Sequence, residues 1–132
     1  MSGAIRNQVI VIKLGGSVLA DEASVPSAVH EVYAWVRRGW KVVAVVSAFR
    51  GETDALLEQA ARLGVGGSAR GTLAAWTALG ESRSAALLGL ALERSGIAAE
   101  VSDPAGVGLI TSGPTLDAEP VAVDTDAVRA AL

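Results

Sequence analysis

The sequence contains no cysteine and a single histidine, and aromatic residues make up 4% of its 132 residues. Without cysteine the chain forms no disulfide bond, offers no thiolate nucleophile and has no cysteine-ligated metal site. One histidine cannot build a histidine metal cluster. His30 also lies off the apolar stripe of its expected helix, so we predict that it is a surface residue. We predict no resident metal site.

Long apolar runs and an excess of basic charge are also absent. No apolar run approaches the roughly 20 residues of a membrane-spanning helix, and the N-terminus lacks the plan of a signal peptide. The formal net charge is −3, and Arg37, Arg38 and Lys41 are too few to form a basic stripe. We therefore expect no membrane or nucleic-acid partner, and a cytoplasmic location.

Hydrophobic residues make up 51% of the sequence, and most of them are alanine, valine and leucine. A chain of this length suits one domain that buries roughly two-thirds of its unfolded surface. Apolar periodicity alternates between strand and helix in the order β-α-β-α-α-β. We predict a single α/β domain over residues 1–132, with a mostly parallel sheet and helices on both faces.

The same periodicity places the individual elements. Strands are expected over residues 9–12, 41–46, 98–102 and 120–123, with turns on both sides of a short run at 109–111. Helices are expected from a Ser24 cap to Gly39, over 53–63, over 73–95 with an interruption near Gly80, and from 125 onward. A glycine-rich loop over 64–71 is expected to be a flexible linker.

The most informative stretch joins the first strand to Lys13, Gly15, Gly16 and Ser17. Adjacent glycines let the backbone turn and point uncovered N–H groups at an anion, and Lys13 adds a mobile positive charge. This pattern predicts a phosphate site. The alternative is an ordinary strand-to-helix turn with Lys13 extended into solvent.

Two further clusters follow the later elements. Ser47 ends the second strand and should neighbour Lys13, because ligands in open α/β sheets bind beyond the carboxyl ends of the strands. The loop from Ser47 to Thr53 then offers hydroxyl groups and a helix N-terminus, which could equally be an ordinary cap. Gly80 precedes Glu81 inside a helical stretch, where glycine costs about 1 kcal/mol and suggests the close approach of a ligand or a break between two helices.

Taken in order, these segments resemble the amino-acid kinase family, and aspartokinases in particular. The resemblance rests on Lys-Leu-Gly-Gly-Ser from residue 13, Val-Val-Ser-Ala from 45, Thr-Asp-Ala-Leu-Leu from 53, and Leu-Gly-Glu from 79. It extends to residues 95–97 and 108–111. It covers nearly the whole chain, and we expect it to match the N-terminal, substrate-side half of that family's kinase domain.

The resemblance implies phosphoryl transfer from ATP, with Mg²⁺, to the side-chain carboxylate of aspartate. Lys13 would neutralise the transferring group and serve as the catalytic residue, while Gly15, Gly16 and Ser17 would cradle phosphate. Aspartate would be held by the substrate-binding residues Ser47, Thr53 and Glu81, with Glu81 facing its ammonium group. The family's nucleotide-binding half is expected to lie outside this chain, so association with that half or homo-oligomerisation is also expected.

Three functional hypotheses stay open on the sequence. The first is part of an aspartokinase, or of an aspartokinase fused to homoserine dehydrogenase. The second is a noncatalytic module for amino-acid binding or assembly. The third is a kinase that acts on another acid such as acetylglutamate and is completed by a separate chain. This hypothesis arises because the sequence of residues 14–18 also resembles acetylglutamate kinase.

Overall fold

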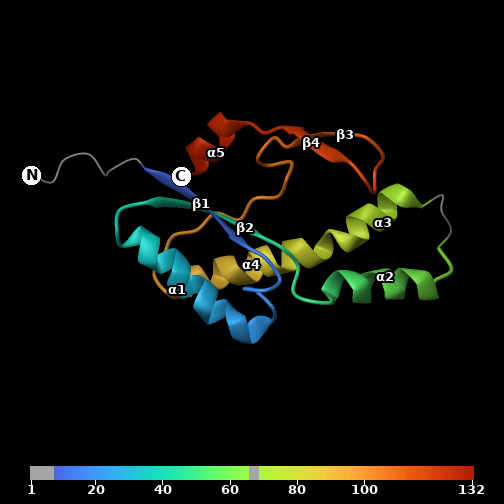
Figure 1. Ribbon diagram of the computed structural model, residues 1–132, viewed down its shortest axis with the longest axis horizontal. Helices are drawn as coiled ribbons and strands as arrows, with labels where there is room; N and C mark the ends of the chain where they lie inside the picture. Colours follow the sequence, from blue (N-terminus) through green and yellow to red (C-terminus); the bar gives the residue numbers. More distant parts are fainter. Residues whose placement is uncertain (1–7, 66–68) are drawn as a thin grey trace, which may run out of the picture.

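A pair of parallel strands and two helices packed against it form the centre of the molecule (Figure 1). The computed structural model describes residues 8–65 and 69–132. The strands are β1 (Val9–Leu14), β2 (Lys41–Val46), β3 (Ile110–Ser112) and β4 (Glu119–Ala122). The helices are the short 3₁₀ helix η1 (Glu22–Ser24), α1 (Val25–Val36), α2 (Glu52–Arg62), α3 (Arg70–Thr77), α4 (Leu79–Arg94) and α5 (Thr125–Ala131).

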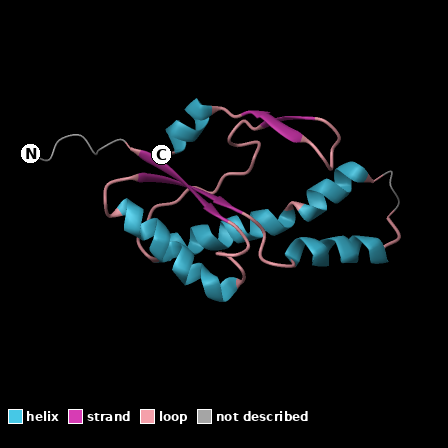
Figure 2. Cartoon of the chain, in the orientation of Figure 1, coloured by secondary structure: helices cyan, strands magenta, loops and turns pink. Residues whose placement is uncertain are grey.

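β1 and β2 pair in parallel from Val9 opposite Lys41 to Leu14 opposite Val46. β3 and β4 form a separate antiparallel pair with an irregular register after Ile110, as Figure 2 shows. The predicted α/β class with parallel strands is therefore confirmed. Strand β2 has the predicted bounds because the five residues after Lys41 form one apolar, largely β-branched run that ends at a serine.

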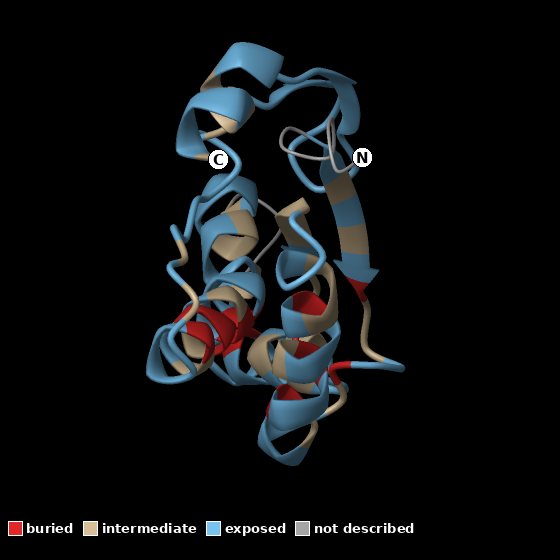
Figure 3. Ribbon diagram, turned by 90° about the vertical axis from the view of Figure 1, so that its left-hand side faces the viewer, coloured by how far each residue is buried: buried red, intermediate tan, exposed pale blue. Residues whose placement is uncertain are grey.

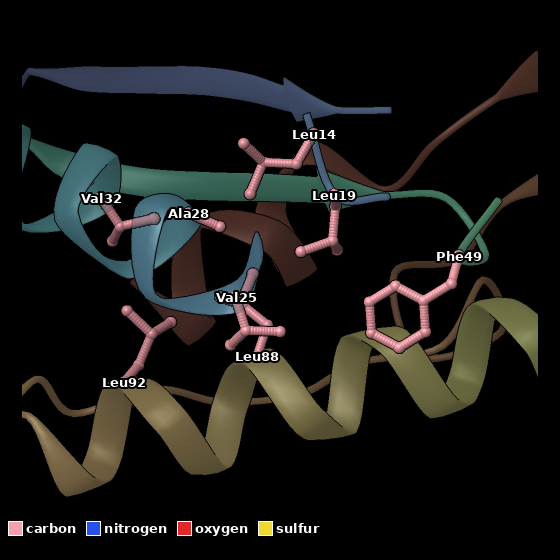
Figure 4. Close-up of a cluster of buried hydrophobic side chains, with 8 residues drawn as sticks. All are labelled: Leu14, Leu19, Val25, Ala28, Val32, Phe49, Leu88 and Leu92. Atoms are coloured by element: carbon pink, nitrogen blue, oxygen red, sulfur yellow. The ribbon is translucent and has the colours of Figure 1, made fainter. Parts of the chain in front are cut away.

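The core lies between the sheet, α1 and α4 (Figure 4). Its buried members are Leu14, Leu19, Val25, Ala28, Val32, Phe49, Leu88 and Leu92. Alternate strand residues pack against it, because side chains on a strand point to opposite faces in turn. On the opposite face, Val9, Val11 and Val45 are 42%, 65% and 48% exposed. The described helices that contact β2 are α1 and α4, so this outer face is largely open.

One predicted element is wrong. Residues 98–102 do not form a strand, because a strand needs a hydrogen-bonded neighbour and the described sheet around β1 contains only β2. The segment still alternates in burial. Ile97 and Ala99 pack against the core, whereas Ala98 and Glu100 are exposed. The apolar alternation that suggested a strand thus reflects how residues 97–100 pack against the core on one side only.

The helices also differ in detail from the expected ones. The stretch 73–95 is two helices, and the chain bends at Ala78 instead of Gly80, which lies inside α4. Gly71 lies in α3, while residues 66–68 of the expected linker fall outside the described part of the chain. Ser24 precedes α1, but its hydroxyl exchanges hydrogen bonds with Asp21 in a capping box around η1. His30 is exposed, as predicted.

Burial is concentrated in the first three quarters of the chain (Figure 3). The segment from Asp103 to Leu132 contains β3, β4 and α5 and has no buried residue. The connection between β3 and β4 nevertheless reaches α3, as Figure 1 shows. The C-terminal segment is therefore a surface layer that adds no buried residue to the core.

Candidate functional site

The chain leaves β1 through a turn that we call the glycine loop, residues 15–20. The Gly15 carbonyl accepts hydrogen bonds from the amides of Val18 (2.9 Å) and Leu19 (2.8 Å). Leu19 is fully buried and fixes the far end of the turn in the core. Because both ends are anchored, the middle of the loop, Gly16 and Ser17, is presented at the surface.

Of the two expected roles of these glycines, the turn itself does not require them. Neither has a positive φ, so the backbone conformation does not itself require glycine. A Cβ built at Gly15 would meet nothing within 4 Å, and one at Gly16 would only reach the Ala48 carbonyl at 4.0 Å. The missing side chains therefore leave the backbone uncovered. Within the described residues, the amides of Gly16 and Ser17 donate to no protein acceptor, which leaves two N–H groups for an anion.

Lys13 lies beside this loop, in an outward position of β1 opposite Val45. Its side chain is exposed and has no carboxylate partner among the residues that the structure describes. A free ammonium group and two free amides at the carboxyl end of a parallel strand form a donor set suited to phosphate oxygens. Lys13, Gly15, Gly16 and Ser17 are thus brought together in one place.

A second loop, residues 47–51, packs directly on the glycine loop; we call it the serine loop. The Ser47 amide donates to the Leu14 carbonyl (3.2 Å), and the Arg50 amide donates to the Ala20 carbonyl (3.0 Å). Ser47 therefore lies next to Leu14, at the start of the glycine loop. The serine loop leads into α2, whose second residue is Thr53.

Helix α4 packs against the serine loop, and this contact explains why α4 has a glycine at position 80. A Cβ at Gly80 would lie 2.9 Å from the Ala48 Cβ, so only glycine permits this approach. One turn later the fully buried Ser84 donates its hydroxyl to the Ser47 carbonyl (2.7 Å). Sequence reasoning missed Ser84. The sequence could have indicated Ser84, because Gly80, Ser84, Leu88 and Leu92 are spaced four residues apart and so lie on one face of α4. The two small residues on this face mark where α4 needs small side chains.

Thr53 and Glu81 line a shared cavity of about 250 Å³ that is largely open to solvent. Its walls come from α2, from the α3–α4 junction and from the turn between β3 and β4. The other lining residues are Ala74, Thr77, Ala78, Thr115 and Leu116. Glu81 is exposed and has no ion-pair partner in the described part of the chain, so its carboxylate is free to accept a ligand's ammonium group.

The structure therefore divides the expected site residues into two groups. The phosphate group surrounds the glycine loop, while Thr53 and Glu81 share the cavity. Ser47 is not among the residues that line this cavity, and it lies on the loop that joins the two groups. Thr77, Thr115 and Leu116 were not anticipated. Nothing in the local sequence indicates that the turn between β3 and β4 folds back over α3.

A charged cluster braces the junction between these groups. Arg83 of α4 forms ion pairs with Glu22 and, at 3.1 Å, with Glu52. Its guanidinium group also lies 5.3 Å from the centre of the Phe49 ring. The second carboxylate oxygen of Glu52 is buried and has no partner among the described residues. Arg83 thus joins η1, the serine loop and α2.

Within residues 8–65 and 69–132, no three acidic, histidine or cysteine side chains gather in a way that could hold a metal ion. No helix in those ranges is long and apolar enough to cross a membrane.

An open amide loop and a free lysine at the carboxyl ends of parallel strands are typical of α/β domains that handle phosphate. The chain belongs to the amino acid kinase family, whose family model matches residues 8–132. It is similar to the crystal structure of aspartate kinase from Synechocystis, with 28% sequence identity and a TM-score of 0.60. This match covers 67% of the present chain and 15% of that chain. A comparison with curated proteins gave no match.

Proposed function

We propose that this chain carries the amino-acid-binding and phosphate-binding side of an aspartokinase-like kinase. In the proposed reaction, a side-chain carboxylate oxygen of aspartate attacks the γ-phosphorus of ATP, and the bond to ADP breaks. The products are an aspartyl acyl phosphate and ADP. The observation that carries this proposal is the cavity that Thr53 and Glu81 line together. The similarity to an aspartate kinase supports the choice of substrate.

The residues present fit the phosphate end of ATP, since free amides and an unpaired ammonium group are the donors that phosphate oxygens need. Bound ATP supplies the transferable phosphoryl group. Lys13 would offset negative charge on that group, and the Gly16 and Ser17 amides would hold it in place. The attacking carboxylate is ionised near neutral pH, so it needs positioning and no general base.

In the cavity, the Thr53 hydroxyl would bind a carboxylate of aspartate, and Glu81 would accept hydrogen bonds from the ammonium group. Ser47 would reach the substrate from the serine loop, held there by Ser84. ATP with Mg²⁺ as co-substrate, and self-association or association with a nucleotide-binding half, remain predictions. The cytoplasmic location also remains a prediction, drawn from the apolar pattern of the sequence.

Isothermal titration of the 132-residue chain with aspartate and with acetylglutamate tests the cavity. Acetylglutamate has no ammonium group, so Glu81→Gln should weaken aspartate binding about tenfold or more and leave acetylglutamate unaffected. Glu93→Gln, at an exposed position of the same helix, is the matched control and should bind aspartate like the wild type.

The acetylglutamate hypothesis gives a different result in the same titration. Preferential binding of acetylglutamate would replace aspartate with that substrate. Aspartate binding that survives Glu81→Gln would overturn the assigned cavity. In an active form of the kinase, Lys13→Ala should lower turnover far more than stability, and normal rates in this variant would contradict the role of Lys13.

A further inference from the structure

Arg50 lies against the glycine loop although 34 residues separate it from Gly16. Its backbone amide donates to the Ala20 carbonyl (3.0 Å), and its guanidinium Nη2 donates to the Gly16 carbonyl (3.4 Å). The residue is exposed, whereas the preceding Phe49 is buried and holds this part of the serine loop in the core. A rigid backbone thus delivers a solvent-accessible guanidinium group to the loop that carries the free amides.

The charge of Arg50 has no counter-ion in the part of the chain that the structure describes. No carboxylate lies within ion-pair distance of it among the described residues, whereas Arg83 is paired with both Glu22 and Glu52. A guanidinium group carries five N–H donors in a planar fork. The 3.4 Å contact to Gly16 uses one of them, at a distance beyond the usual range for such bonds. Most of the donor capacity of Arg50 therefore remains available.

We propose that Arg50 is a second cationic ligand of the phosphate site, acting beside Lys13 and the amides of Gly16 and Ser17. The inference rests on the proposed function only in that the glycine loop binds phosphate. A phosphate oxygen is a stronger acceptor for guanidinium than a backbone carbonyl, and the fork geometry matches two phosphate oxygens at once. An exposed side chain can exchange the Gly16 carbonyl for phosphate by rotation about its own bonds, without moving the backbone.

A purely structural brace is the competing role, and Arg50→Gln separates the two. Glutamine keeps an N–H donor for the Gly16 carbonyl but loses the charge and the fork. The test is isothermal titration of the full chain with tripolyphosphate and, separately, with aspartate. Arg94→Gln, which removes a charge from an exposed position in the last turn of α4, is the control. Thermal unfolding of each variant checks that the fold is intact.

Arg50→Gln should bind tripolyphosphate about tenfold more weakly than the wild type and bind aspartate unchanged. The difference should shrink at high salt, since an exposed charge is screened. Wild-type affinity in Arg50→Gln, with Lys13→Gln impaired, would overturn the role of Arg50 and leave the proposed function standing. Loss of aspartate binding instead would also overturn it. No binding of tripolyphosphate by the wild type would overturn both this role and the phosphate site of the proposed function.

Discussion

Gly80 determines how closely helix α4 approaches the serine loop. In Gly80→Ala the new Cβ would lie 2.9 Å from the Ala48 Cβ, so the loop and the helix must separate. Overpacking of this kind costs about 1–3 kcal/mol, and the better helix propensity of alanine offsets at most about 1 kcal/mol. We expect a net loss in the free energy of unfolding, measured by urea denaturation.

Two variants control for this effect. Gly71 is also helical, but a Cβ there meets nothing within 4 Å, so Gly71→Ala should be neutral or stabilising. Adding Ala48→Gly to Gly80→Ala removes the clashing methyl group and should recover part of the loss. If Gly80→Ala were as stable as Gly71→Ala, the close approach of α4 to the serine loop would be wrong.

Arg83 is the charged counterpart of this packing contact. The Glu52 side chain is 19% exposed and the Glu22 side chain 67% exposed, so the two ion pairs differ in value. Arg83→Gln leaves a nearly buried carboxylate without its cation, which should destabilise the fold by about 1–3 kcal/mol. Glu22→Gln removes an exposed pair and should cost less than about 1 kcal/mol.

A double-mutant cycle measured by urea denaturation isolates the Arg83–Glu52 interaction. Glu52→Gln in the Arg83→Gln background should recover stability, because the stranded charge is gone. Additive losses in the double variant would show that the two residues do not interact and would contradict the brace.

At the scale of elements, the apolar pattern of a segment predicted a strand correctly where the segment's own residues determine its structure. The strand over residues 41–46 has its predicted bounds, since an apolar, largely β-branched run ending at a serine has few other ways to fold. Residues 98–102 alternate in burial but form no strand, because no other strand of the described chain lies beside them. Pairing is a property of the whole fold that a single segment does not encode.

The candidate site follows the same division. Thr53 and Glu81 were predictable because both occur in short family-like motifs, whereas Thr115 and Leu116 join them through the fold-back of a turn. Gly80 was singled out for the right reason, its cost in a helix, but the approaching group is Ala48. The four-residue repeat of small and apolar positions on α4 would have indicated both that contact and Ser84.

Helices α2 and α3 are held together by a specific hydrogen bond that should be separable from packing. The Trp76 Nε1 donates to the Leu56 carbonyl (2.8 Å) across the two helices. Trp76→Phe keeps an aromatic ring and loses this bond, so we expect a loss of about 0.5–1.5 kcal/mol. Amide hydrogen exchange in α3 should quicken, because α3 forms one wall of the cavity and has no buried residue of its own.

Trp35→Phe is the matched control for that measurement. Trp35 also donates from Nε1, but to the exposed Glu31 carboxylate within α1 (3.1 Å). Its loss should change exchange in α1 and leave α3 unaffected. Equal exchange of α3 in Trp76→Phe and wild type would contradict the coupling of α2 to α3.

At the scale of the whole molecule, the C-terminal part of the chain lines the cavity without adding a buried residue to the core. Every residue of the hydrophobic core cluster lies between Leu14 and Leu92, and the segment from Asp103 onward has no buried residue. That segment nevertheless supplies Thr115 and Leu116 to the cavity. The C-terminal layer should therefore matter more for ligand binding than for folding.

Shortening the chain tests this separation. A chain ending at Ser102 keeps the whole core, so its urea midpoint should stay close to that of the full chain, while aspartate binding should weaken several-fold as one cavity wall is lost. A chain ending at Asp124 removes only α5, keeps β3 and β4, and should retain both properties. If the chain that ends at Ser102 were unfolded, the C-terminal layer would be needed to stabilise the core. This layer would then bury more apolar area than the exposure of its own residues indicates.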